Sequence, residues 1–125
     1  MVPMDSIRPV IAVVEDDFAL SEALERLLRA TGFEALVFSD AEKFGQSDRF
    51  EELACLVLDL NLPGRSGFEL MEELRGAGVP LPVILMTADD SPATLNRAAQ
   101  SHCSALLLKP FEAPELVACI RQVLR

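Results

Sequence analysis

The chain has 125 residues, half of them hydrophobic, and a formal net charge of −9 at pH 7. That length suits one globular domain, predicted over residues 1–125 with an ordered core from about residue 8, and no apolar block reaches the ~18 residues of a membrane span. The excess of acid argues against direct nucleic-acid binding, because phosphate backbones recruit basic surfaces.

No signal peptide is evident between Met1 and Arg8. The chain has three cysteines, an odd number, and they are widely spaced among apolar residues: Cys55, Cys103 and Cys119. This pattern favours reduced thiols in the core over disulfides or a zinc site. We therefore expect a cytoplasmic protein that does not bind a membrane.

The first apolar run, Val10–Val14, predicts a strand buried on both faces, as in a parallel sheet. Acidic residues 15–17 follow it directly. An amphipathic helix comes next, with Asp17 as its N-cap and Gly32 as its stop. Its inward face is Leu20, Leu24, Leu27 and Leu28.

Glu34–Phe38 is a shorter and more polar apolar run, which predicts a strand at an edge of the sheet. Asp40 is placed to cap a short helix from Ala41 towards Gln46. Residues 47–53 are expected to form the end of that helix and a loop.

The central run, Cys55–Leu58, leads straight into Asp59 and then into a loop that contains Pro63, Gly64 and Gly67. Asp59 is therefore predicted to lie where a buried strand ends and a turn opens to water. In open α/β sheets, ligands bind at this carboxyl edge.

Ser66–Glu69 reads as a capping box that opens a helix, with Phe68, Met71 and Leu74 inward and an end near Gly76, Gly78 and Pro80. The fourth strand is expected at Val83–Met86, running into Thr87. A helix starting at Ser91-Pro92 follows, and it is poor in large apolar residues.

Ala105–Leu108 predicts the fifth strand, which ends at Lys109-Pro110. The last helix is expected to bury Leu116, Val117, Ile120, Val123 and Leu124. Five alternating strand–helix units predict a parallel sheet with right-handed crossovers and helices on both faces.

Polar residues stand at four strand ends: Glu15 with Asp16, Asp59, Thr87, and Lys109. Each alone has an ordinary structural explanation, such as a helix cap or a surface turn. Because parallel strands end at one edge, the four positions together indicate a shared functional site.

Four segments carry a resemblance to a known family: VVEDD (13–17), LVLDLNLPGRSG (56–67), LMTA (85–88) and LLKPF (107–111). In this order and spacing the chain resembles the receiver domains of two-component response regulators, over residues of about 8 to 125. It is similar to the chemotaxis response regulator and to receivers attached to helix-turn-helix domains. The resemblance implies a flavodoxin-like α/β fold, a doubly wound five-stranded parallel sheet of order 2-1-3-4-5 with five helices.

The resemblance also implies roles for the strand-end residues. Asp59 would be the phosphoacceptor, with Lys109 and the Thr87 hydroxyl contacting the phosphoryl group. The cofactor would be Mg²⁺, held by Asp16 directly, by Glu15 through water, by Asp59, and by the backbone carbonyl of Asn61.

Three further positions would tune the lifetime of the phosphorylated state: Asn61, Ala88 and Asp89. All three are small, so we expect fast self-dephosphorylation. The Lys109–Pro110 bond resembles the cis peptide of the family.

Two positions depart from the family pattern. Leu106 replaces the usual aromatic residue, so Thr87 and Leu106 form an atypical output switch. His102 replaces a usual glycine, at a turn where positive φ is expected.

The implied function is a signalling switch that is phosphorylated by a sensor histidine kinase. The output surface, which could also form a homodimer, would combine the fourth helix, the fifth strand and the last helix. Transcription would be regulated through an output domain or effector protein that is missing or separate. Enzymatic activity would be limited to slow self-phosphorylation from small donors and self-dephosphorylation.

Other functions remain open on the sequence alone. The chain could be a single-domain receiver that acts as a phosphorelay shuttle or a protein-binding switch, or a phosphate-independent interaction domain. A Mg²⁺-dependent aspartyl phosphohydrolase is less favoured, since Asn61 stands where such enzymes place a second acid. A flavodoxin-like binding module would need a glycine-rich loop after the first strand, where this chain has EDDF.

Overall fold

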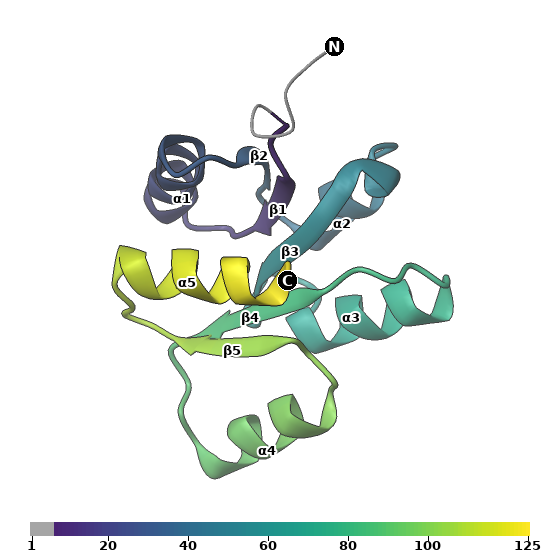
Figure 1. Cartoon of the computed structure of the whole chain (residues 1–125). Helices are drawn as coiled ribbons and strands as arrows, with labels where there is room; N and C mark the ends of the chain where they lie inside the picture. Colours follow the sequence, from purple (N-terminus) through teal and green to yellow (C-terminus); the bar gives the residue numbers. More distant parts are fainter. Residues whose placement is uncertain (1–6) are drawn as a thin grey trace.

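The computed structural model describes residues 7–125, so residues 1–6 of the predicted domain lie outside the described part. Figure 1 shows strands and helices alternating along the chain. The strands are β1 Val10–Val14, β2 Glu34–Phe38, β3 Leu53–Asp59, β4 Val83–Thr87 and β5 Ala105–Leu108. The helices are α1 Phe18–Ala30, α2 Ala41–Gly45, α3 Gly67–Gly76, α4 Pro92–Gln100 and α5 Ala113–Val123.

All strand pairs are parallel, and the sheet order is β2-β1-β3-β4-β5. This confirms the predicted fold and the edge position of β2. The central strands β1, β3 and β4 are almost wholly buried, which explains why their sequences are continuous apolar runs rather than alternating ones.

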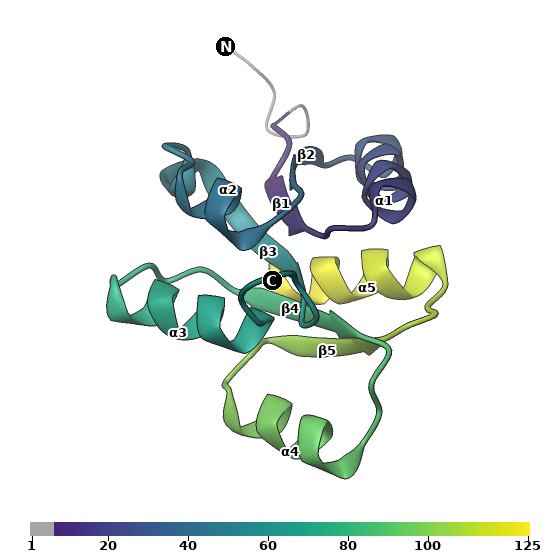
Figure 2. The ribbon, with the colours of Figure 1, turned by 180° about the vertical axis from the view of Figure 1, so that it is seen from behind.

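Helices cover both faces of the sheet, α1 and α5 on one side and α2, α3 and α4 on the other (Figures 1 and 2). Alternate residues of each buried strand point to opposite layers. In β3, for example, Leu56 and Leu58 pack with α2 and α3, while Cys55 and Val57 pack with α1 and α5. The two layers hold the strand ends in fixed positions.

The predicted helix starts are confirmed at atomic detail. In α1, α2, α3 and α4 the N-cap side chain accepts a hydrogen bond from the backbone amide three residues on, which satisfies a donor that the helix itself cannot pair. These N-caps are Asp17, Asp40, Ser66 and Ser91.

Two sequence expectations need correction. β3 begins at Leu53, after a single 3-10 turn at Phe50–Glu52, instead of emerging from a loop. The turn forms because Phe50 packs edge-to-face on Phe44, with ring centroids 5.1 Å apart. The last two apolar residues, Val123 at the end of α5 and Leu124 just after it, are only partly buried, although both pack against the core.

Two expectations about the segments that flank β5 are confirmed. The Lys109–Pro110 peptide is cis, and His102 has a φ of 62°. Leu106 is half-buried, whereas Leu108 is 43% exposed. Among the residues described, no helix is long and apolar enough to cross a membrane.

Candidate functional site

The site forms at the carboxyl ends of four adjacent strands. β1 and β3 are in register at Val14 and Leu58, and Asp59 pairs with Met86 of β4. Thr87 is paired in turn with Leu108 of β5. The residue that follows each strand, or ends it, is therefore delivered to the same edge of the sheet.

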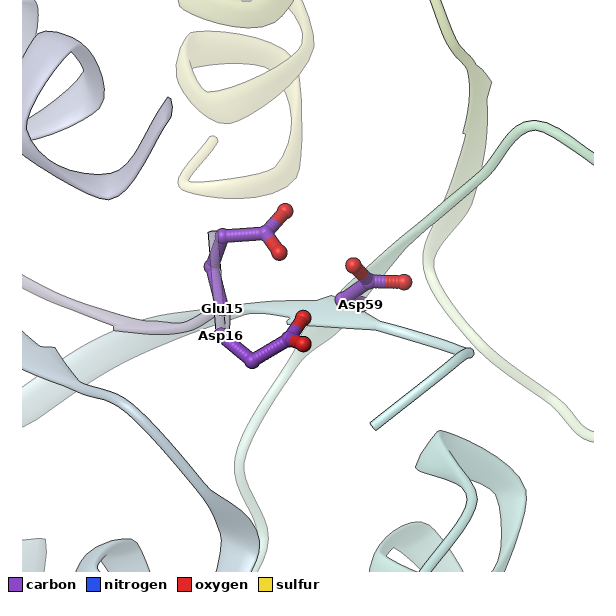
Figure 3. A group of neighbouring side chains, drawn as sticks. All are labelled: Glu15, Asp16 and Asp59. Atoms are coloured by element: carbon purple, nitrogen blue, oxygen red, sulfur yellow. The ribbon is translucent and has the colours of Figure 1, made fainter. Parts of the chain in front are cut away.

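Three carboxylates converge there, as Figure 3 shows. Glu15, Asp16 and Asp59 each place one oxygen within 4.8 Å of the others. Glu15 and Asp59 are buried, while Asp16 is exposed. A compact group of hard oxygen ligands with one side open to water fits Mg²⁺, which binds a few carboxylates and retains several waters.

Lys109 lies between the two buried carboxylates. Its Nζ donates to Oε1 of Glu15 at 2.6 Å and to Oδ2 of Asp59 at 2.9 Å. The lysine side chain is 22% exposed and Glu15 only 1%. One ammonium thus compensates two negative charges that burial would otherwise make costly.

The two buried acids differ in acidity. Burial and then the neighbouring Asp59 carboxyl raise the pKa of Glu15 to about 7, although Lys109 and the Asp17 amide oppose this. Burial also acts to raise the pKa of Asp59, but hydrogen bonds with Glu15, Asn61 and Lys109 outweigh it and hold that pKa below its usual value. Asp59 is therefore ionised at neutral pH, the form in which its oxygen is nucleophilic.

The side chain of Lys109 stays protonated for a similar reason. Burial acts to lower the pKa of the ammonium, but the bonds to Glu15 and Asp59 raise it above its ordinary value. Lys109 thus remains a cation beside the Asp59 carboxylate across the physiological range.

Asn61 and Thr87 complete the immediate surroundings of Asp59. The Asn61 backbone amide donates to Oδ1 of Asp59 at 2.9 Å, which fixes the direction of the carboxylate. The Asn61 side-chain amide donates to the Thr87 hydroxyl at 3.3 Å. Thr87 is 1% exposed. The loop that contains Asn61 thus orients the Asp59 carboxylate and also contacts the Thr87 hydroxyl.

The remaining predicted positions lie around this group. Ala88 is exposed at the start of the β4–α4 loop, and the Asp89 carboxylate bonds to Ser91 and Thr94 of the helix start. Leu106 lies on β5 and packs on the α3 and α4 side of the sheet. Asp17 caps α1 and takes no part in the carboxylate group. The expected fast self-dephosphorylation stays a prediction.

Sequence reasoning missed the role of Gly67 in this site. A Cβ atom on Gly67 would lie 2.8 Å from the backbone oxygen of Asp59 and 3.0 Å from Cα of Leu60. The start of α3 therefore packs directly against the end of β3, and only glycine leaves room. The available signal was a glycine placed directly after the Ser66 N-cap, where most residues are allowed.

Sequence reasoning also missed an apolar surface next to the site. A pocket of about 400 Å³ is lined by Asp17, Leu20, Ala88, Lys109, Pro110 and Phe111. Phe18, the first residue of α1, is 77% exposed. The Phe18 ring therefore adds an exposed apolar side chain one residue from Asp17, which lines the pocket.

Comparison with known proteins finds similarity to response regulators. The family model described as the response regulator receiver domain matches residues 11–121. Nodulation protein W of Bradyrhizobium diazoefficiens is 35% identical over 116 residues, which cover 92% of this chain and 51% of that protein. The DNA-binding response regulator MtrA of Mycobacterium tuberculosis is 34% identical over 122 residues, covering 98% and 53%.

Solved structures show the same likeness. The response regulator StyR superposes with a TM-score of 0.84 at 40% identity, covering 94% of this chain and 60% of that one. Full-length FixJ from B. japonicum gives a TM-score of 0.83 at 32% identity, covering 94% and 58%. The chain spans about half the length of the curated relatives it matches.

Proposed function

This chain belongs to the response regulator receiver domains, and we propose that it is a switch in which Asp59 accepts a phosphoryl group from a phosphohistidine. The observation that carries the proposal is the pairing of the Asp59 carboxylate with the Lys109 ammonium, 2.9 Å apart, at the edge where three carboxylates converge. It combines an ionised nucleophile with a fixed positive charge for the incoming phosphoryl oxygens.

In the proposed reaction an oxygen of Asp59 attacks phosphorus, and the phosphorus–nitrogen bond of the phosphohistidine breaks. The bonding electron pair stays on the imidazole nitrogen, and Asp59 becomes an acyl phosphate. Lys109 turns from the Asp59 oxygen to a phosphoryl oxygen, and the Thr87 hydroxyl donates to another. The chain's contribution is thus positioning and charge compensation, on which phosphoryl transfer mainly depends.

The residues fit a Mg²⁺ ion as the cofactor. Asp16 and Asp59 would hold it directly, Glu15 through a water, and Asn61 through its backbone carbonyl. When bound, the ion neutralises negative charge that develops on the phosphoryl oxygens. The exposure of Asp16 and its place in the carboxylate group support its assignment as a direct ligand.

The donor would be a histidine kinase, or another protein with a phosphohistidine, that docks over Phe18 and the apolar pocket. Phe111, in the segment after β5, lines that pocket together with Lys109, and the exposed Phe18 follows another lining residue, Asp17, at the start of α1. An aromatic residue desolvated by the partner can supply much of the binding energy of a small interface.

The phosphorylated form would present a changed surface made by α4, β5 and α5, through a self-associating face or an output domain. Leu95 on α4 and Leu108 on β5 are 38% and 43% exposed and give this face its apolar character. Because MtrA is named as DNA-binding, we propose that the output regulates transcription in the full-length protein. The receiver itself, with a net charge of −9, is not the part that binds DNA.

Incubation with acetyl phosphate and Mg²⁺, followed by intact-mass analysis and peptide mapping, tests the proposal. One phosphate should add to the chain, at Asp59. Sustained turnover of a small phosphate ester, without accumulation of the phosphoprotein, would favour the phosphohydrolase alternative instead. The Asn61 amide, which stands where that alternative needs an acid, supports the switch.

A further inference from the structure

We propose that Asp89 is a positioning residue that latches helix α4 to the Thr87 hydroxyl, so that the two are released together when Asp59 is phosphorylated. The inference rests on the proposed function of Asp59. It adds to it the specific contacts that hold the resting position of α4.

The Thr87 hydroxyl has both of its acceptor positions occupied. The Asn61 side chain donates to it at 3.3 Å, and the backbone amide of Asp89 donates at 3.0 Å. A hydroxyl offers two lone pairs and one proton, so the proton is what remains for a phosphoryl oxygen. Any movement of Thr87 towards such an oxygen acts directly on the backbone of Asp89.

The Asp89 carboxylate continues the chain of contacts into α4. Its Oδ1 accepts from the amide of Ser91, the N-cap, at 2.9 Å, and its Oδ2 accepts from the hydroxyl of Thr94 at 2.6 Å. Ser91 in turn accepts from the Thr94 amide. The bond from Thr94 and then that from Ser91 hold the pKa of Asp89 below its usual value, so the carboxylate stays charged.

This arrangement replaces half of a capping box. In a capping box the third helical residue is Glu or Gln, and its side chain accepts from the N-cap amide. Here that residue is Thr94, which cannot reach back in this way, and Asp89 accepts from the Ser91 amide from outside the helix. The cap of α4 is therefore supplied by the loop that also holds Thr87.

The latch matters because the core holds α4 weakly. Ala98 is its only buried residue. Its other links are polar or at the surface. Arg97 lies over the Phe68 ring at 4.3 Å, and Arg75 donates to the Ser101 carbonyl at the far end. The N-terminal turn of the helix thus depends on Asp89 and Thr94 for its position.

Phosphorylation would then have to break or rebuild these contacts. Because these contacts favour the resting position of α4, a variant without the Asp89–Thr94 bond needs less free energy to leave that position. Such a variant should therefore bind a phosphoryl mimic more tightly. A substitution that only damages the fold would weaken such binding. The sign of the change therefore separates a latch from a merely structural contact.

The test uses Thr94→Val, which keeps the shape and the local charge but removes the hydroxyl. Thr94→Ser restores the hydroxyl and should rescue. Asp89→Ala removes both carboxylate contacts of the latch but keeps the backbone amide that donates to Thr87, and Asp90→Ala is its control, because it removes the neighbouring exposed charge alone. For each variant we would measure binding of beryllofluoride with Mg²⁺ by ¹⁹F NMR, and amide exchange over residues 92–101 without it.

We expect the affinity for beryllofluoride to rise about three- to tenfold in Thr94→Val, the range that loss of one hydrogen bond allows, and at least as much in Asp89→Ala, which loses two. Exchange over 92–101 should be faster in the same two variants. Thr94→Ser and Asp90→Ala should match the wild type.

Unchanged or weaker binding in Thr94→Val, while the wild type binds normally, would overturn the latch and leave the function of Asp59 intact. Failure of the wild type to bind beryllofluoride would overturn the proposed function, and the latch with it. Faster exchange without tighter binding would show a cap that is only structural, and it would also overturn the latch.

Discussion

The Nζ atom of Lys109 lies 2.9 Å from Oδ2 of Asp59, although the two residues are 50 positions apart in the chain. The contact exists because β3 and β5 both flank β4 and end at the same edge. The same ammonium lies 2.6 Å from Glu15, so one cation serves two buried acids. In the resting site the Lys109 ammonium therefore offsets the negative charge of Glu15 and Asp59, and an added cation or phosphoryl group must change these contacts.

Removal of this ammonium should destabilise the fold in a way that Mg²⁺ corrects. In Lys109→Met two buried carboxylates lose their cation, and we expect a loss of about 3 kcal/mol in the free energy of unfolding, the lower end for a buried ion pair because Lys109 is partly exposed. Because Mg²⁺ supplies positive charge to the same carboxylates, it should stabilise the variant more than the wild type. Denaturant unfolding with and without Mg²⁺ measures both effects.

Lys43→Met is the control for that experiment, since Lys43 is exposed and its ammonium bonds only to the Ser39 hydroxyl among the contacts described. It should lose little stability and show the wild-type response to Mg²⁺. An equal response to Mg²⁺ in Lys109→Met and the wild type would contradict the arrangement of charges described.

The acidic residues after β1 should differ in metal binding. Asp16→Asn should weaken Mg²⁺ binding about tenfold or more, because it removes the exposed member of the carboxylate group. Asp17→Asn makes the same change in charge one residue on, and asparagine still caps α1. Isothermal titration compares the two, as the chain has no Trp or Tyr to report binding. Equal losses would refute the assignment of Asp16.

The close contact between the start of α3 and the end of β3 should make Gly67 intolerant of a side chain. Gly67→Ala places Cβ 2.8 Å from the Asp59 backbone oxygen, and overpacking of this kind costs about 1–3 kcal/mol. Gly45→Ala is the matched control, because no atom lies within 4 Å of its Cβ position. Thermal unfolding should show a lower midpoint for the first variant alone. Equal midpoints for Gly67→Ala and the wild type would mean that the end of β3 shifts to make room for Cβ without loss of stability.

Activation should alter the face made by α4, β5 and α5. With beryllofluoride bound, we expect faster amide exchange over residues 88–106 and a change in association state, since Leu95 and Leu108 already expose apolar surface there. Hydrogen exchange and sedimentation velocity measure the two effects. If neither changes while beryllofluoride binds, this output mechanism is wrong, whatever happens at Asp59.

The elements of this fold could be predicted because most of its local signals agree with the tertiary structure. The buried strands are continuous apolar runs in the sequence, and three helices begin at recognisable N-cap residues, Asp17, Ser66 and Ser91. The start of β3 could not be predicted, because the turn before it depends on Phe50 packing against Phe44 from another element. Packing between residues of different elements leaves no pattern in the local sequence, unlike an apolar run or a helix cap.

The sequence predicts which residues meet at the site, but it does not predict which of their atoms bond to one another. Parallel topology alone brings Glu15, Asp59 and Lys109 to one edge. The sequence does not reveal that Lys109 pairs with Glu15 as well as Asp59, or that the Asp89 carboxylate bonds to Thr94. Such contacts depend on loop geometry and side-chain direction, which periodicity does not encode.

The central claim is that Asp59 is the acceptor, and phosphate incorporation tests it most directly. Wild type and Asp59→Asn should be incubated with acetyl phosphate and Mg²⁺ and compared by intact mass, with Asp17→Asn as a control for the loss of one carboxylate near the site. We expect the mass of one phosphate on the wild type and on Asp17→Asn, and none on Asp59→Asn. Stoichiometric phosphate on Asp59→Asn would contradict the account.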